Sequence, residues 1–297
     1  MRIWIALLSV LAAAYQVPRM PPIAWQPQLS GTTVRLRGVS AVSALVAWAS
    51  GANGTILRTT DGGRTWTPRP VPGAETLDFR DIDALSENVA YALSIGPGAA
   101  SRIYKTSDSG DHWTLQFQNR DPKVFLDAMA FADETQGVAY SDSVDGHLVV
   151  LTTNTGGREW ERVADDRLPP AAPGEGAFAA SGTNVALIGR EHVWIGTSVS
   201  RVVRSTDGGA TWTLVRDRGL SGFRSVVAWV PSAGARSAIA IGPSGADWSS
   251  DDGQTWTPLR SDGFDTVSFA PHTLVGWAAG AGGRIAKLTV TRVNTAR

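Results

Sequence analysis

The chain has 297 residues, of which 27 are basic and 27 acidic, so its formal net charge is zero. Balanced charge argues against nucleic acid as a partner, because nucleic-acid-binding domains carry a basic excess. The absence of cysteine excludes disulfides, thiolate metal sites and a cysteine nucleophile. The 32 glycines and 12 tryptophans indicate many tight turns and large apolar anchors, which favours an all-β protein over a helical bundle.

The first segment of the chain has the pattern of an export signal. Arg2 is followed by an apolar run over residues 3–14 that ends in three alanines, which suits a signal peptidase. We therefore expect residues 1–14 to be a cleaved signal peptide and the mature protein to be periplasmic or secreted. An uncleaved membrane anchor is the alternative, although the run is shorter than a bilayer-spanning helix. Residues 15–24 contain several prolines and are expected to form an extended lead-in.

One short phrase recurs along the chain and ends in tryptophan each time. Its pattern is Ser/Thr-x-Asp-x-Gly-x-Thr-Trp, and the full copies end at Trp66, Trp212 and Trp256. A weaker copy ends at Trp113 and the weakest at Trp160. Successive tryptophans are 44 to 52 residues apart. A repeat of this length is typical of one four-stranded blade of a β-propeller.

The composition of the phrase has a structural explanation. Asp accepts hydrogen bonds from amides of a tight turn, Gly supplies the positive φ of a hairpin, and Trp buries a large ring between sheets. Thr155 replaces the Asp in the weakest copy. We expect structural roles, and neither catalytic nor metal-binding roles, for the Asp, Gly and Trp residues of the other copies: Asp61, Gly63, Trp66, Asp108, Gly110, Trp113, Asp207, Gly209, Trp212, Asp251, Gly253 and Trp256.

Short apolar or alternating segments precede each phrase and predict the remaining strands of each unit. In the first, second, third, fifth and last units these strands are expected at residues 34–42, 44–49, 54–59, 77–84, 88–94, 102–105, 125–131, 137–141, 147–151, 223–230, 237–241, 247–249, 266–269, 275–279 and 284–290. In the fourth unit, residues 161–175 hold three prolines and form a long connection. This connection is either a plain surface loop or an overhang that shapes a binding site.

The last unit has three predicted strands and no phrase after them, so its outer strand is missing. Residues 25–29, which begin with Trp25, have the pattern of an outer strand that lacks a unit of its own. We expect this N-terminal strand to complete the last blade, because closing the ring removes exposed sheet edges. The predicted fold is therefore a single all-β propeller over residues 25–297 with six blades, and seven is the alternative.

The recurring phrase resembles the Asp box, or BNR repeat, of sialidases, some endoglucanases and many non-enzymatic propellers. Residues 54–63 and 275–285 resemble more narrowly the photosystem II stability/assembly factor family and its bacterial relatives, and residues 173–182 resemble a segment of those relatives. The resemblance covers about residues 25–290. It implies a binding or assembly role. We expect a non-catalytic monomer without a cofactor that binds a protein client, such as a segment of a membrane protein.

A charged residue stands just before the apolar start of each inner strand when the six units are aligned. These residues are Arg37, Arg80, Asp127, Glu175, Arg224 and Asp265. Inner strands line the axis of a propeller, and their equivalent ends share one face, so we expect the six charges around one mouth.

Two interpretations of this ring of charges stay open. The charges could neutralise one another and seal the channel, with Arg80 beside Asp127, Arg224 beside Glu175 and Asp265, and Arg37 beside Asp265. Alternatively, the ring binds an anionic or peptide partner, because arginine forks suit carboxylates.

The enzyme alternative is a glycan-active hydrolase, or a glycan-binding propeller without turnover. Sialidases, which share the Asp box, have a Phe/Tyr-Arg-Ile-Pro motif and a late tyrosine nucleophile; here residues 79–82 lack the proline and no tyrosine follows Tyr140. Asp127 and Glu175 could still form an acid/base pair. The four histidines lie in different units without the spacing of metal ligands, so no metal is expected.

Overall fold

The computed structural model describes residues 22–176, 181–198, 202–215, 224–231, 237–250 and 255–291. Within these ranges the chain forms strands and four short 3-10 helices, and no α-helix. No helix in the described ranges is long and apolar enough to cross a membrane. The predicted signal peptide, residues 1–14, lies outside the described residues.

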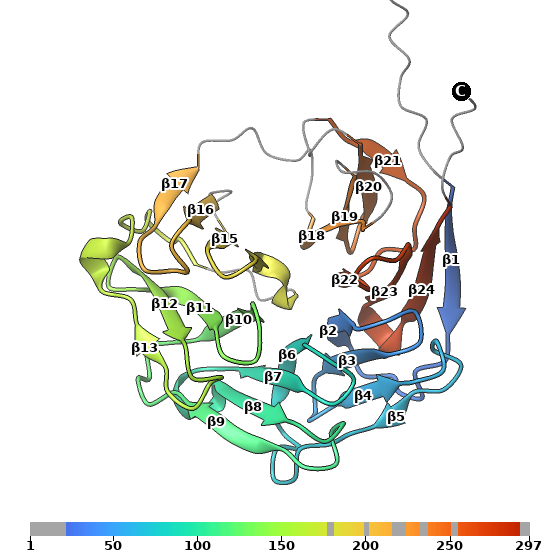
Figure 1. The fold of residues 1–297 in the computed structure, drawn as a ribbon, viewed down its shortest axis with the longest axis horizontal. Helices are drawn as coiled ribbons and strands as arrows, with labels where there is room; N and C mark the ends of the chain where they lie inside the picture. Colours follow the sequence, from blue (N-terminus) through green and yellow to red (C-terminus); the bar gives the residue numbers. More distant parts are fainter. Residues whose placement is uncertain are drawn as a thin grey trace, which may run out of the picture.

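The strands form six four-stranded sheets, which are arranged as blades around one axis (Figure 1). Blades 1 to 3 consist of β2 (Leu36–Ala41), β3 (Ala47–Gly51), β4 (Ile56–Thr59) and β5 (Thr67–Pro68); β6 (Asp78–Ala84), β7 (Ala90–Ile95), β8 (Arg102–Thr106) and β9 (Thr114–Gln118); and β10 (Leu126–Phe131), β11 (Gly137–Val144), β12 (His147–Thr153) and β13 (Glu161–Arg162).

Blades 4 to 6 consist of β14 (Val185–Ile188), β15 (His192–Gly196), β16 (Val202–Ser205) and β17 (Thr213–Val215); β18 (Val226–Trp229), β19 (Ala238–Gly242), β20 (Gly245–Ser249) and β21 (Thr257–Leu259); and β22 (Thr266–Phe269), β23 (Val275–Ala279), β24 (Ile285–Val290) and β1 (Ile23–Gln28). The six-bladed prediction is confirmed, and the long fourth unit forms one blade.

The N-terminal strand closes the ring, as its orphan pattern predicted. β1 pairs antiparallel with β24, from Ile23 opposite Val290 to Gln28 opposite Ile285, and the two strands lie side by side in Figure 1. The Gln28 side chain then reaches blade 1: its Oε1 accepts hydrogen bonds from the indoles of Trp277 (3.1 Å) and Trp66 (3.3 Å). Its Nε2 donates to the carbonyl of Gly62 at 2.9 Å. One glutamine therefore joins the last blade to the first.

Apolar clusters fill the spaces between neighbouring blades. In the described part of the chain, five such clusters lie between blades 1 and 2, 2 and 3, 3 and 4, 5 and 6, and 6 and 1. Within blade 5, Arg224 Nε lies 2.5 Å from Asp247 Oδ2, and both side chains are mostly buried.

Side chains of one blade satisfy the backbone of the next along the ring axis. Ser40 accepts the N–H of Ala84 at 3.0 Å, and Ser268 accepts that of Ala41 at 3.1 Å. Asp83 accepts the N–H of Phe131 at 2.7 Å. The innermost strands have one unpaired edge each, so these bonds satisfy N–H groups that would otherwise be buried alone.

A pH-dependent stability follows from Asp83, whose side chain is partly buried. Burial raises its pKa from 3.8 to about 6, although the Phe131 N–H opposes the shift. Because the folded protein holds this proton more tightly than the unfolded chain, the stability present below pH 3.8 is lost as the pH rises through about 6, by roughly 3 kcal/mol. Asp83→Asn keeps an acceptor for Phe131 and cannot ionise. Urea unfolding should show that the free energy of unfolding of the variant increases relative to that of the wild type as the pH rises through this range. A difference in the free energy of unfolding that does not change with pH would contradict the account.

The recurring phrases form the turns that the sequence predicted. In the first copy, Asp61 Oδ1 accepts the N–H of Thr65 (3.0 Å) and Oδ2 accepts its hydroxyl (2.7 Å). These bonds lower the pKa of Asp61 to about 2. Gly63, at φ +84°, donates its N–H to Thr59 Oγ1 at 2.9 Å. Asp207 accepts the N–H and hydroxyl of Thr211 in the same way. Asp251 and Gly253, in the last copy, lie outside the described residues.

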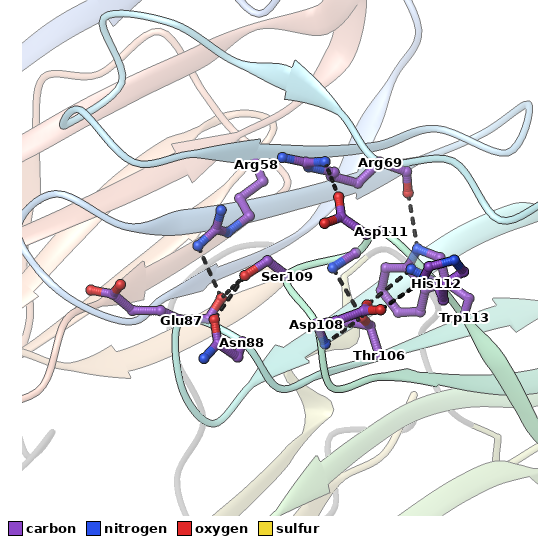
Figure 2. Close-up of polar contacts among 11 residues, drawn as sticks. Arg58, Arg69, Glu87, Asn88, Thr106, Asp108, Ser109, Asp111, His112 and Trp113 are labelled. Atoms are coloured by element: carbon purple, nitrogen blue, oxygen red, sulfur yellow. Dashed lines mark hydrogen bonds and ion pairs between the residues drawn. The ribbon is translucent and has the colours of Figure 1, made fainter.

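The second copy shows how each turn also contacts the preceding blade (Figure 2). Asp108 accepts the N–H of His112 at 2.9 Å. The Trp113 indole donates to the carbonyl of Arg69 on blade 1 at 3.2 Å, and its ring packs edge-on against Trp48 with centroids 6.1 Å apart. Arg69 also pairs with Asp111 across the same junction at 2.5 Å. The repeated tryptophan therefore joins successive blades, as expected from its size.

The weakest turn can be improved. Thr155 Oγ1 accepts the N–H of Glu159 at 2.9 Å, which replaces one of the bonds that Asp makes elsewhere, and Gly157 still donates to Thr153 at 3.0 Å. We expect the double substitution Thr155→Asp with Glu159→Thr to restore the second bond and to raise the free energy of unfolding by about 1 kcal/mol. Chemical denaturation measures this, and a loss of stability would contradict the assigned role.

Candidate binding site

The inner strands of the first three blades carry the predicted charges at structurally equivalent bulges. Arg37, Arg80 and Asp127 are each the extra residue where two residues of the inner strand oppose one on its neighbour. Such bulges redirect a side chain out of the regular alternation. Asp265 directly precedes β22, and Arg224 lies two residues before β18. Five of the six predicted residues therefore mark the beginnings of inner strands, on one face that we call the mouth.

Three arginines gather in the part of the mouth formed by blades 1 and 2. The pKa of Arg37 is lowered, first by burial and then by the positive charges of Arg80 and Arg35. Asp265 and Asp78 act on the pKa of Arg37 in the opposite direction. In the described part of the chain, the charges that act on Arg37 are thus those of two further guanidinium groups and two carboxylates.

The ion pairs at the mouth differ from those that the alignment predicted. Asp265 binds Arg35, not Arg37, through two parallel hydrogen bonds of 2.7 and 2.8 Å. Arg80 lies 3.0 Å from Asp78. Arg224 pairs with Asp247, a partner that the alignment did not predict.

The partners Arg35, Asp78 and Asp247 were missed because the alignment took one residue from each inner strand. Arg35 and Asp78 each lie two residues before a bulge arginine, and that alternation was the available signal. Asp247 lies on β20, where the corresponding residues of β4 and β8, Leu57 and Tyr104, are apolar.

Asp127 differs from the other members of the ring of charges. Its side chain is 1% exposed, and its Oδ2 accepts no hydrogen bond from the described residues. Burial and the nearby charge of Asp142 raise the pKa of Asp127 to about 8, while Arg80 opposes this shift. At neutral pH Asp127 is therefore mainly protonated and does not neutralise Arg80.

Glu175 does not occupy the start of an inner strand, in contrast to its predicted register. It lies in the connection before β14, where its Oε2 accepts the N–H of Ala172 at 2.7 Å and its carbonyl accepts the hydroxyl of Ser143. The same connection packs on blade 3 through the N–H of Ala171, which donates to Gly146 at 3.1 Å. The long fourth-unit connection thus covers the mouth-side turn of blade 3, which favours the overhang over a plain loop.

A short 3-10 helix, η3 (Gly182–Asn184), crosses the region of the ring axis. It lies close to β2, β6, β10 and β18, which belong to four different blades. Gly182 rests on Asp81, so closely that a Cβ there would stand 1.8 Å from Oδ1 of that carboxyl. Ser181 donates its hydroxyl to the carbonyl of Ser225 at 2.9 Å. The helix η3 therefore lies at the level of Asp81, the residue that follows the bulge residue Arg80 in β6.

The described residues hold no group of three or more His, Asp or Glu side chains that could bind a metal ion. What the geometry offers is a charged surface with an arginine cluster, set in a closed ring. Together the six sheets, the N-terminal closing strand and the Asp-containing turns define a six-bladed β-propeller with a charged mouth.

Comparisons with known proteins agree with the resemblance found in the sequence. No protein-family model matches the chain. The photosystem II stability/assembly factor HCF136 of Arabidopsis thaliana is 31% identical over 110 residues, which are 36% of this chain and 25% of that protein. The corresponding protein of Oryza sativa subsp. japonica is 29% identical over 120 residues, 39% of this chain and 27% of that protein. The matched stretch thus spans about a quarter of the length of these relatives.

Solved structures show the same fold over most of the chain. YCF48 from Cyanidioschyzon merolae covers 90% of this chain and 99% of its own with a TM-score of 0.62 at 15% identity. YCF48 bound to a D1 peptide covers 90% of this chain and 97% of its own, with a TM-score of 0.56 at 16% identity. A protein named as a putative gluconolactonase covers 92% of this chain and 94% of its own, with a TM-score of 0.64 at 12% identity. The chain therefore resembles the photosystem II assembly factors, and its fold also occurs in a protein named as an enzyme.

Proposed function

We propose that this protein is a non-catalytic propeller that binds a protein client, as an assembly or stability factor similar to HCF136 and YCF48. The observation that carries the proposal is the arginine cluster of the mouth. Burial, and after it the charges of Arg80 and Arg35, lowers the pKa of Arg37, while two carboxylates oppose this shift. Guanidinium groups bind carboxylates through paired hydrogen bonds, so an acidic group of a client suits this cluster.

A peptide segment is the form of client that the comparisons support best. One of the similar structures is YCF48 with a D1 peptide, and the ring of charges here offers both acidic and basic groups to an extended chain. We propose that a segment of a membrane protein binds across the mouth, and that the protein acts as a monomer in the periplasm or outside the cell after its signal peptide is removed.

The experiment is a crosslinking capture with the tagged full chain in cells of its own host. We expect a defined protein client to be recovered, and a synthetic peptide that covers the crosslinked segment to bind the purified protein. Mass spectrometry of the mature N-terminus and of each cell fraction tests export in the same samples. Recovery of no client above a tag-only control would contradict the proposal.

Glycan hydrolysis is the second candidate, because a buried, protonated Asp127 has the ionisation state of a general acid. Its 1% exposure argues against direct contact with a substrate. A panel of fluorogenic glycosides decides between the two functions. Turnover that disappears in Glu175→Gln would replace the binding proposal, while an inactive panel would leave client binding as the function.

A further inference from the structure

Asp78 occupies a central place among the mouth arginines. It lies at the start of β6, and its Oδ2 is 3.0 Å from Nε of Arg80. Its negative charge also contributes an upward shift to the pKa of Arg35 and to that of Arg37, although the pKa of Arg37 is lowered overall. One carboxylate thus stands within electrostatic reach of the three guanidinium groups on which the proposed function depends.

The other carboxylate of the cluster, Asp265, has a different situation. Asp265 is 2% exposed, and both of its oxygens accept hydrogen bonds from Arg35, so it is a fixed counter-ion. The Asp78 side chain is 30% exposed as a whole, while its Oδ1 is buried and accepts no hydrogen bond from the described residues. A partly exposed carboxylate with one unbonded oxygen can be displaced at lower cost than a buried one whose two oxygens are both bonded.

This inference rests on the proposed function. We propose that Asp78 is the specificity-determining residue of the mouth: it holds, as an internal carboxylate, the place beside Arg37 and Arg80 that a carboxylate of the client takes. Its charge also selects among anions. A doubly charged group meets twice the repulsion that a single carboxylate meets, because Coulomb energy scales with charge. Asp78 therefore reduces the preference for doubly charged phosphate and sulfate groups that the three guanidinium groups would otherwise give, to the advantage of acidic side chains and chain ends.

The test is an NMR titration of the arginine Nε–Hε signals of the full mature chain with acetate and, separately, with sulfate. We expect Asp78→Asn to tighten acetate binding about 5-fold and sulfate binding about 25-fold. The substitution removes a unit charge about 5–6 Å from the bound anion, and the repulsion energy that is relieved is twice as large for doubly charged sulfate as for acetate. Asp111→Asn, which removes an exposed carboxylate at the outer rim, should change neither. Asp78→Ser gives a second form that lacks the charge.

The outcomes separate the two proposals. Equal gains for acetate and sulfate, no gain, or weaker binding in both Asp78 variants would overturn the role of Asp78, even if the wild type still captures its client. If neither anion shifts the signals of Arg37 and Arg80 in any form of the protein, Asp78 does not control an anion site and the proposed site fails with it.

Discussion

A double variant, Arg37→Gln with Arg80→Gln, is expected to lose client binding by a factor of about 100 or more while the ring stays folded. Each arginine would contribute a charge-assisted hydrogen bond to an acidic group, of about 1.5–3 kcal/mol, and both act on the same part of the mouth. Glutamine keeps part of the side-chain length and removes the charge. Affinity is measured by titrating the variant with the peptide identified by crosslinking.

Arg224 is left out of this variant for a structural reason. It is buried with Asp247, and removing one partner of a buried ion pair leaves an uncompensated charge, at a cost of about 3–5 kcal/mol. The matched control is Arg64→Gln with Arg158→Gln, which removes two exposed positive charges from the turns on the opposite face. Equal losses in the two double variants would show that net charge, and not the mouth, controls binding.

Removal of residues 1–28 is expected to have the largest effect on the fold. This truncation deletes β1, exposes the edge of β24, and leaves the indoles of Trp66 and Trp277 without the Gln28 acceptor. It also removes Trp25, which stacks on Phe264 with ring centroids 5.3 Å apart. We expect a loss of more than about 5 kcal/mol, enough to lower the melting temperature by roughly 10 °C or more in a domain of this size.

Complementation provides the control for the truncation. A synthetic peptide of residues 22–31 should restore part of the lost thermal stability when added to the truncated chain, because it can occupy the vacant edge of β24. The same peptide with Gln28→Ala should restore less. A truncated chain that melts like the full protein would show that closure by β1 does not stabilise the ring.

The sequence predicted the architecture because the features that specify it are local. Each turn needs Asp, Gly and Trp at fixed spacing, and those residues contact one another within a few positions, as Asp61 and Thr65 do. The closing strand was predictable for a related reason: Trp25 repeats the tryptophan of an outer strand that the last unit lacks. The strands of blade 6 were placed to the residue at 266–269 and 275–279.

The partners within the mouth could not be predicted in the same way. Arg35 and Asp265 are 230 positions apart, and their pairing depends on how the first and last blades meet after closure. The bulges at Arg37 and Arg80 also turn those side chains away from the faces that simple alternation assigns. In the fourth unit, the long connection removed the register on which the placement of Glu175 relied.

Site-specific photocrosslinking tests the central claim, that the client binds at the mouth, most directly. A photoreactive residue at Thr76, which is exposed just before β6 on the mouth face, is compared with one at Leu45, which is exposed in the turn after β2 at the opposite end of the strands. We predict client adducts from Thr76 and none from Leu45. Adducts from Leu45 with none from Thr76 would contradict the account.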